Sequence, residues 1–514
     1  MPEPDRQTSG VRYEDVDSEY FEKRKMRRYA RIGSLWALGV GAVISGDFFG
    51  WNFGLEHGGF GGLLIATLII TVMYVGLCFS IAEMSPALPH TGGAYSFARS
   101  AMGPWGAYIT GLAENMEYIL TPAVIVTGIG SYLNEIFGAE LAAFLGIDPV
   151  LLEPVWWAAF YVLFVGLNIA GAEMSFRFTV LITLLALGIL AVFYVGAIPH
   201  FDFDRWALSI EPDEGGTAWL PRGWEGVLGA LPFAIWFYLA IEELPLAAEE
   251  SHDPRKDMPR GVLLGLLTLV VAAFLTLFLN SGIDPGAAAL GKSEKPLLDG
   301  FRTIFGEGIG AKALALIAVT GLVASFHTII FAYGRQIFSL SRAGYFPRWL
   351  SVTHVTRNTP YVALVVGAVL GYVIALVIWL LGEKHPVGAV LLNMAVFGAV
   401  LSYMMQMASF ILLRIRMPDI ERPYRSPFGI PGAAVALLIS LGTLVTLFIV
   451  DEVYQKVVVG AAIWFALGLL YFAVYARSRL VFAPEEEFAL SHGRAAGPEE
   501  MHDGDDGADE DDGR

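Results

Sequence analysis

Residues 40–54 read VGAVISGDFFGWNFG, an apolar and glycine-rich stretch with Asp47 at its centre. Its composition is typical of a segment buried in a membrane, where an ionised carboxylate costs about 3 kcal/mol or more. Such a group therefore normally faces a cavity or a partner. Three interpretations are open for Asp47: recognition of a cation, coupling to a proton or sodium ion, and a local structural cap.

The composition of the whole chain indicates a membrane protein. Of its 514 residues, 55% are hydrophobic and 16% are charged, whereas a soluble chain carries about 25% charged residues. The apolar residues come in blocks of roughly 20, enough to cross a hydrocarbon core of about 30 Å. Residues 1–31 are polar and charged, so we expect no cleavable signal peptide. The fold class expected is an all-α, multi-pass membrane protein.

The apolar blocks define twelve expected transmembrane helices. They lie at residues 33–54, 60–83, 104–132, 154–171, 178–198, 224–247, 261–282, 310–341, 360–381, 387–413, 430–450 and 456–476. With the N-terminal segment in the cytoplasm, the cytoplasmic side holds 25 of the 33 Lys and Arg residues. The positive-inside rule therefore predicts that both termini are cytoplasmic, in a cell (plasma or inner) membrane.

The first and sixth spans differ from the others. Five glycines interrupt the first, and the sixth carries Pro232, Pro245 and the adjacent acids Glu242 and Glu243. Glycine and proline both weaken a helix, and interrupted spans at corresponding positions indicate two inverted five-helix repeats with a binding site between them. The alternative is that these residues are ordinary packing glycines and a kink.

The expected domain organisation follows from these spans. It comprises a cytoplasmic N-terminal segment (1–31), repeat 1 with helices 1–5 (32–198), repeat 2 with helices 6–10 (199–416), helices 11 and 12 (417–480), and an acidic, disordered cytoplasmic tail (481–514). Residues 498–514 hold nine acidic residues and one arginine, a composition that cannot bury apolar surface.

Further carboxylates lie inside the expected spans. Glu114 and Glu117 are three residues apart and share one face of span 3, while Glu242 and Glu243 lie in span 6. The same spans offer no lysine or arginine that would neutralise them, so these acids are protonated or meet a cation from outside the protein. A transported organic cation fits, because aromatic side chains nearby in the sequence could supply cation–π contacts: Trp51, Trp236, Phe237 and Tyr238.

Span 8 contains His327, Ser325 and Thr328. A buried, hydrogen-bonded histidine is one interpretation, and a proton relay or a substrate contact is the other. The two hydroxyls could bind a cation or simply bond back to their own helix. The sequence contains no HExxH, CxxC or GxSxG motif, and we therefore do not expect an enzyme.

Over roughly residues 30–480 the chain resembles the amino acid–polyamine–organocation (APC) transporter superfamily. The matching pieces are the glycine-rich first span, AEMSPALPHTGGAY (82–95), SRAGYFP (341–347) and ERPYRSPFGIPG (421–432). Within the superfamily, SGDFFGWNFGLEHGGFGG (45–62) and IWFYLAIEELPLAAEE (235–250) resemble the ethanolamine permease branch.

This resemblance implies a 5+5 inverted repeat (the LeuT-type fold) with broken helices 1 and 6, two extra C-terminal helices, and transport by alternating access. It places a substrate site at the two breaks, for which the candidates are Ser45, Gly46, Asp47, Phe48, Glu117, Trp236, Tyr238, Ala240, Glu242 and Glu243. In relatives that carry amino acids, a Gly-Ser/Thr-Gly run at the first break binds the substrate carboxylate. Ser45, Gly46 and Asp47 align with that run. Asp47 would repel a carboxylate and attract an amine that lacks one.

The coupling ion stays open at this stage. Several proton-coupled relatives carry a lysine in span 5, and the alignment puts Ala186 there. Sodium bound near Val43, Ser325 and Thr328, protonation of a buried acid or of His327, and uniport all remain. No cofactor is expected other than a coupling proton or Na⁺.

The leading hypothesis is a secondary transporter that imports ethanolamine or a similar small protonated amine. The alternatives are an amino acid or polyamine permease or exchanger of the same superfamily and, from another class, a membrane nutrient sensor. The expected partners are the amine and membrane lipids, without nucleic acid.

Overall fold

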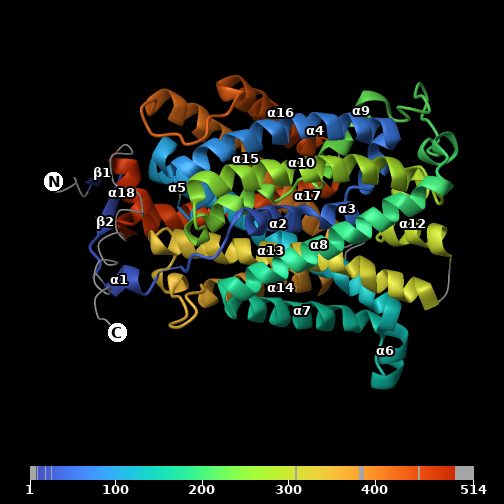
Figure 1. Ribbon diagram of the computed structural model, residues 1–514, viewed down its shortest axis with the longest axis horizontal. Coiled ribbons are helices and arrows are strands. Elements are labelled where there is room, and N and C mark those ends of the chain that lie inside the picture. The colour runs from blue at the N-terminus through green and yellow to red at the C-terminus, as the bar shows by residue number, and fades with distance from the viewer. Residues whose placement is uncertain are drawn as a thin grey trace, which may run out of the picture.

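The computed structural model describes residues 7–8, 10–17, 19–24, 26–88, 90–306, 309–380, 387–449 and 452–491. Within these ranges the fold is all-α apart from three short strands, as expected (Figure 1). Ten helices in the described part are long and apolar enough to cross a membrane. They are α4 (Phe53–Ala87), α5 (Gly93–Leu133), α7 (Glu153–Ile169), α8 (Ala172–Ala197), α10 (Pro254–Ser281), α13 (Ile309–Arg342), α14 (Tyr361–Leu380), α15 (Val387–Arg416), α16 (Gly429–Ile449) and α17 (Glu452–Val474).

Two further spans are broken, which confirms the expectation for the first and sixth. The first runs through α2 (Ile32–Val43) and α3 (Ser45–Phe48), which the helical residue Ile44 joins, and is interrupted between Phe48 and Phe53, where α4 begins. The sixth is interrupted between α9 (Gly223–Ile235) and the 3₁₀ segment η5 (Ile241–Glu250). With the ten long helices, two of which are kinked at Gly59 (α4) and Gly103 (α5), they account for the twelve expected spans.

Short elements complete the chain. The helices are α1 (Glu19–Glu22), α6 (Ala139–Leu145), α11 (Ala287–Leu290), α12 (Pro296–Phe305) and α18 (Pro484–Leu490). The 3₁₀ and π segments are η1 (Asn134–Gly138), η2 (Pro149–Leu152), η3 (Ile198–His200), η4 (Phe203–Ala207), η6 (Arg348–Ser351) and η7 (Ala476–Ser478). The strands β1 (Gln7–Thr8), β2 (Val11–Glu14) and β3 (Leu480–Val481) form one small sheet in that order.

The contacts between helices have an internal symmetry. If spans 1–5 are renamed 6–10 and spans 6–10 are renamed 1–5, several contacts between two spans correspond to other observed contacts. Span 1 (α2) packs against span 7 (α10), and span 6 (α9) packs against span 2 (α4). Span 3 (α5) packs against span 10 (α15), and span 8 (α13) packs against span 5 (α8). Such exchanged pairings are what two related five-helix units interlocked in opposite orientation produce.

The helices differ in how deeply they lie in the bundle. In their most apolar windows α13 and α5 have 83% and 78% of their residues buried inside the protein, whereas α17 has 17%. Spans 3 and 8 are therefore central. The extra helix α17 lies at the periphery, where its apolar side chains face lipid.

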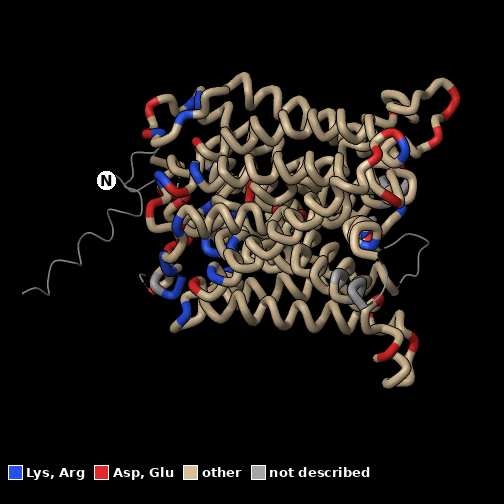
Figure 2. Tube along the Cα trace, turned by 45° about the vertical axis from the view of Figure 1, so that its right-hand side comes forward, with Lys and Arg blue, Asp and Glu red and all other residues tan. Residues whose placement is uncertain are grey.

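Both described ends of the chain lie at the same end of the bundle, with β1, β2, α1 and α18 (Figure 1). We call this the terminal end. Lys and Arg residues gather there along the backbone trace (Figure 2). Residues 481–491 depart from the expected disordered tail, because they include a β3 residue and the buried helix α18. Residues 492–514, the rest of that predicted tail, lie outside the described residues.

The two broken spans touch each other at Gly46. A Cβ atom added to Gly46 would overlap the backbone carbonyl group of Trp236. The chain at the break of span 6 therefore approaches span 1 as closely as backbone atoms allow, and only glycine permits this approach.

Substitution of Gly46 should consequently separate the breaks. Gly46→Ala is expected to cost about 1–3 kcal/mol or more, because the carbonyl of Trp236 must move. A fall in the thermal midpoint of the purified protein, together with loss of transport, would show this.

Gly188→Ala provides the matched control. Gly188 lies in α8, and a Cβ there meets nothing within 4 Å, so alanine should leave the midpoint unchanged or raise it slightly. Equal midpoints for the two variants would mean that the breaks do not depend on Gly46.

Candidate functional site

The backbone of the first span leaves the helix one turn later than the sequence predicts. Residues Ser45–Phe48 still form the helical turn α3, and the non-helical backbone begins at Phe49, which is extended. Gly50 follows with φ +100°, a conformation that favours glycine. Asp47 therefore lies in the last turn before the break rather than within it.

The sixth span is interrupted between Ile235 and Ile241. Ala240 has φ +81°, a left-handed conformation that costs a non-glycine residue of order 1–3 kcal/mol. Strain of this kind is common at binding sites. Trp236 lies against Gly50, since a Cβ there would be 3.3 Å from the indole ring. The two breaks thus face each other over several residues.

Asp47 is fully buried and only half satisfied. Its Oδ1 atom accepts a 2.8 Å hydrogen bond from the Thr276 hydroxyl on α10, and Thr276 is in turn 2.8 Å from the Tyr194 hydroxyl on α8. Its Oδ2 atom has no hydrogen-bond partner among the described residues. No Lys or Arg within the described ranges pairs with it, so one carboxylate oxygen stays available to a ligand.

Aromatic side chains surround the breaks, as the sequence predicts. The ring of Tyr238 lies 5.1 Å from that of Tyr74, and its hydroxyl is 2.7 Å from Thr71. Trp51 stacks on Phe237 at 5.5 Å. The indole N–H groups of Trp51 and Trp236 are buried without a partner in the described structure. Of the predicted residues, Phe48 points elsewhere and packs on Gly321 of α13.

The other predicted carboxylates form a second group, which we call the acid cluster: Glu114 and Glu117 on α5 and Glu242 and Glu243 on η5. The carboxyl groups of Glu117 and Glu242 interact electrostatically, and Glu243 lies near both. Among the described residues, none of the four carboxylates forms an ion pair, and the oxygens of Glu242 and Glu243 have no hydrogen-bond partner. The cluster must carry protons or meet a cation from outside the protein.

Hydroxyl and amide groups reach two members of the acid cluster. Tyr403 of α15 lies 3.5 Å from Glu117 and receives a 2.9 Å hydrogen bond from Tyr74. Gln336 of α13 donates a 2.6 Å bond to Glu114. Asp47 is bound instead by Thr276 of α10. The structure therefore places the predicted acids in two separate groups and not around a single binding site.

The residues predicted for ion coupling are satisfied within the protein. The Ser325 hydroxyl donates to the Gly41 carbonyl at 2.8 Å and accepts from the Ser45 amide at 2.9 Å. Thr328 bonds back to the carbonyl of Ala324 in its own helix. Val43 is buried at the end of α2. Ser325 therefore joins span 8 to the helical part of the first span, just before the break.

His327 is also bonded inside the protein. Its two ring nitrogens lie 3.1 Å from Asn168 of α7 and 3.1 Å from Ser175 of α8, and its ring packs against Phe178. This geometry favours the interpretation of a buried, hydrogen-bonded histidine.

Sequence reasoning missed the hydroxyls that touch the site. Thr276 holds Asp47, Tyr194 in turn bonds to Thr276, and Tyr403 reaches Glu117. Thr183 lies in α8, the span in which the alignment pointed to Ala186. Its hydroxyl faces Gly41 of the first span, since a Cβ added to Gly41 would be 2.5 Å from that hydroxyl. Isolated hydroxyls in apolar spans are the only signal for them, and many such groups merely bond to their own helix.

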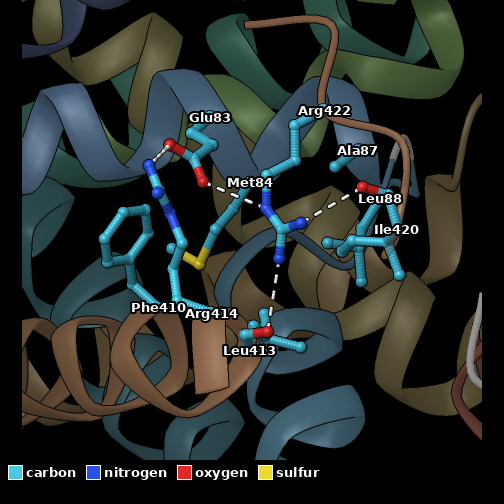
Figure 3. A pocket seen from close by; sticks show the side chains of 9 residues that line it. All are labelled: Glu83, Met84, Ala87, Leu88, Phe410, Leu413, Arg414, Ile420 and Arg422. Atoms are coloured by element: carbon cyan, nitrogen blue, oxygen red, sulfur yellow. Dashed lines mark hydrogen bonds and ion pairs between the residues drawn. The ribbon is translucent and has the colours of Figure 1, made fainter. Parts of the chain in front are cut away.

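A pocket at the terminal end has a different character (Figure 3). Its lining comprises Glu83, Met84, Ala87, Leu88, Phe410, Leu413, Arg414, Ile420 and Arg422. Glu83 pairs with Arg414 at 2.5 Å and Arg422 at 3.1 Å, and Arg422 donates to the carbonyls of Leu413 and Ile420. None of the break residues lines it. These ion pairs hold the loop between α15 and α16.

Comparison with known proteins identifies the family. A family model for amino acid permeases matches residues 34–491. The chain belongs to the amino acid permease family. An uncharacterized transporter of Rhizobium meliloti is 30% identical to it over 446 residues, which cover 84% of this chain and 89% of the relative. The permease is therefore a multi-pass membrane transporter and not an enzyme.

Two further relatives come from Bacillus subtilis. The branched-chain amino acid permease BcaP is 24% identical to the permease, with 88% of this chain and 94% of the relative covered. The methylthioribose transporter is 25% identical, with 89% and 95% covered.

The Ser325 bridge can be tested through stability alone. Ser325→Ala removes a donor and an acceptor that join span 8 to the first span just before its break, and we expect it to lower the free energy of unfolding by about 2 kcal/mol. Denaturant titration of the purified permease measures the change.

Ser409→Ala is the matched control, because the Ser409 hydroxyl bonds only to the carbonyl of Met405 one turn earlier. Its effect should stay below about 1 kcal/mol, because only one hydrogen bond within a single helix is lost. If both variants unfold alike, the bridge contributes no stability.

Proposed function

We propose that this permease carries ethanolamine or a similar small protonated amine by alternating access. The observation that carries the proposal is the Oδ2 atom of Asp47, a buried carboxylate oxygen without a hydrogen-bond partner among the described residues. An ammonium group supplies what this oxygen lacks, namely a positive charge and N–H donors. A buried polar atom left unpaired costs about 1–3 kcal/mol, so a ligand that pairs with it gains that amount.

The same place is unfavourable for a substrate carboxylate. The Ser45 amide, which aligns with a carboxylate-binding position in amino acid carriers, already donates to Ser325. The Asp47 amide bonds within the turn to the carbonyl of Ile44, at 3.1 Å. A carboxylate would meet occupied amides and the negative charge of Asp47, whereas an amine without a carboxylate would not be repelled.

The surrounding aromatic rings support a small cation. Trp236 and Tyr238 are buried at the break of span 6, beside the turn that contains Asp47. Cation–π contact with such rings is worth about 1–2 kcal/mol in a desolvated site. The names of the relatives do not require an amino acid, since one of them is named for methylthioribose, a sugar derivative.

The second candidate is amino acid transport, which the family description and the name of the branched-chain amino acid permease favour. We also propose that the terminal end faces the cytoplasm, because Lys and Arg gather there (Figure 2).

Charge removal at Asp47 tests the amine. Asp47→Asn keeps the size of the side chain and loses the charge, and we expect at least a 30-fold weaker apparent affinity for labelled ethanolamine. Counterflow in proteoliposomes with ethanolamine, alanine and putrescine measures substrate choice. Asp204→Asn, at an exposed position of η4, should leave uptake unchanged. Strong alanine uptake by the unmodified permease without ethanolamine uptake would establish the second candidate instead.

Thr276 offers an independent test of the geometry at Asp47. Thr276→Val removes the hydroxyl that fixes Oδ1, and we expect KM for ethanolamine to rise roughly tenfold with little change in maximal rate. Thr276→Ser keeps the donor and should restore KM. An unaltered KM in Thr276→Val would mean that the orientation of Asp47 does not determine binding.

A further inference from the structure

The segment after α17 folds back onto the terminal end of the bundle (Figure 1). Strand β3 pairs in parallel with β2, with Tyr13 opposite Leu480. Helix α18 then packs against α5. Two of its three consecutive acidic residues, Glu485 and Glu486, are at most 1% exposed. Acidic residues are seldom buried unless they are paired, so this helix is held by specific partners.

Glu486 joins three separate parts of the chain. It accepts hydrogen bonds from Tyr13 at 2.6 Å, from Tyr345 at 2.7 Å and from the Arg99 guanidinium on α5 at 2.6 Å. Burial, and next the charge of Glu486, raise the pKa of Tyr13 and Tyr345, so both hydroxyls stay protonated and donate. The N-terminal strand, the loop after α13 and the start of α5 therefore meet on one carboxylate.

Glu485 reaches the two central spans and, through them, the broken span 6. It accepts from the Tyr95 hydroxyl on α5 and from Arg342 at the end of α13, the latter at 3.2 Å. Arg342 also binds both oxygens of Glu249, near the end of η5, at 2.9 and 2.7 Å. One guanidinium thus links α18 to the second half of span 6.

Further bonds hold that half of span 6 to its neighbours. The Thr91 amide, just before α5, donates to Glu249 at 3.1 Å. The amides of Tyr29 and Ala30, just before α2, donate to the carbonyl of Glu250. Movement of η5 away from α5 and α13 would therefore have to break the Arg342–Glu249 pair or pull Arg342 from Glu485.

We propose that α18 is a latch, which holds the terminal end of the permease closed through Glu485 and Glu486. In alternating access one bundle moves against the other around a fixed site, and the halves of the broken spans move with it. Opening at the terminal end separates η5 from the central spans, and α18 opposes this separation because Glu485 holds the Arg342 guanidinium that binds both oxygens of Glu249 on η5. The inference goes beyond the proposed function, since it does not depend on which substrate is carried.

Two truncations separate the latch from the rest of the C-terminus. One ends after Ala483 and removes α18, and the other ends after Ser491 and keeps it. The reporter is Ala248→Cys on η5, a fully buried position, in a Cys78→Ser background that has no other cysteine. In nanodiscs without substrate, a maleimide reagent should label the reporter at least about fivefold faster in the shorter protein. The longer truncation should label at the rate of the full chain.

A second reporter detects general loosening of the fold. It is Ala207→Cys, a buried position of η4. The segment that joins α8 to α9, to which η4 belongs, lies at the other end of the bundle from α18 (Figure 1). Labelling of this second reporter should be the same in both truncations. Equal labelling of Ala248→Cys in the two truncations would overturn the latch, and so would acceleration of both reporters together.

Point substitutions in the full chain complete the test, because a truncation that fails to fold would yield no labelling rate. Arg99→Gln with Glu486→Gln removes both charges of one pair and leaves no unpaired buried charge. We expect faster labelling of Ala248→Cys in this double variant. Glu487→Gln, on the same helix but partly exposed, is the control and should match the unmodified chain. Equal rates in the double variant and the control would overturn the proposal.

Discussion

The close approach of Gly46 to the carbonyl of Trp236 is the constraint on which the rest of the structure depends. A membrane interior offers no water to backbone groups, so two interrupted helices persist only where they face each other or a cavity. The missing side chain of one glycine lets spans 1 and 6 meet at their breaks. Asp47, the strained residue Ala240 and the aromatic side chains owe their positions to that contact.

Pairing with arginine separates two kinds of buried carboxylate in the described structure. At the terminal end Glu83, Glu485 and Glu486 are bound by guanidinium groups, which compensate the cost of burial. Asp47 and the acid cluster have no such partner within the described ranges. The first kind holds loops and termini in place. The second kind can take up a proton or bind a cation, because no arginine neutralises it. A site for a cation or a proton requires such carboxylates.

The central spans connect these two regions. Helix α13 carries Ser325, which binds the first span just before its break, and ends in Arg342, which binds both Glu249 and α18. Helix α5 carries Glu117 in its middle and Arg99 near its start. A displacement at the breaks therefore has a route to the terminal end through α13 and through α5, whose backbone is kinked at Gly103 between Arg99 and Glu117.

The sequence by itself determined the helical membrane class, the twelve spans and the breaks in spans 1 and 6, because hydropathy and the glycine and proline pattern are local properties. It also singled out Asp47, since a carboxylate in an apolar run is conspicuous. Only the tertiary structure decided that Thr276 holds Asp47, that the acids divide into two groups, and that Glu485 and Glu486 are buried against arginines. Those contacts join residues more than 100 positions apart in the chain. In the sequence alone a run of acidic residues predicts a solvated segment, because only the fold brings its arginine partners next to it.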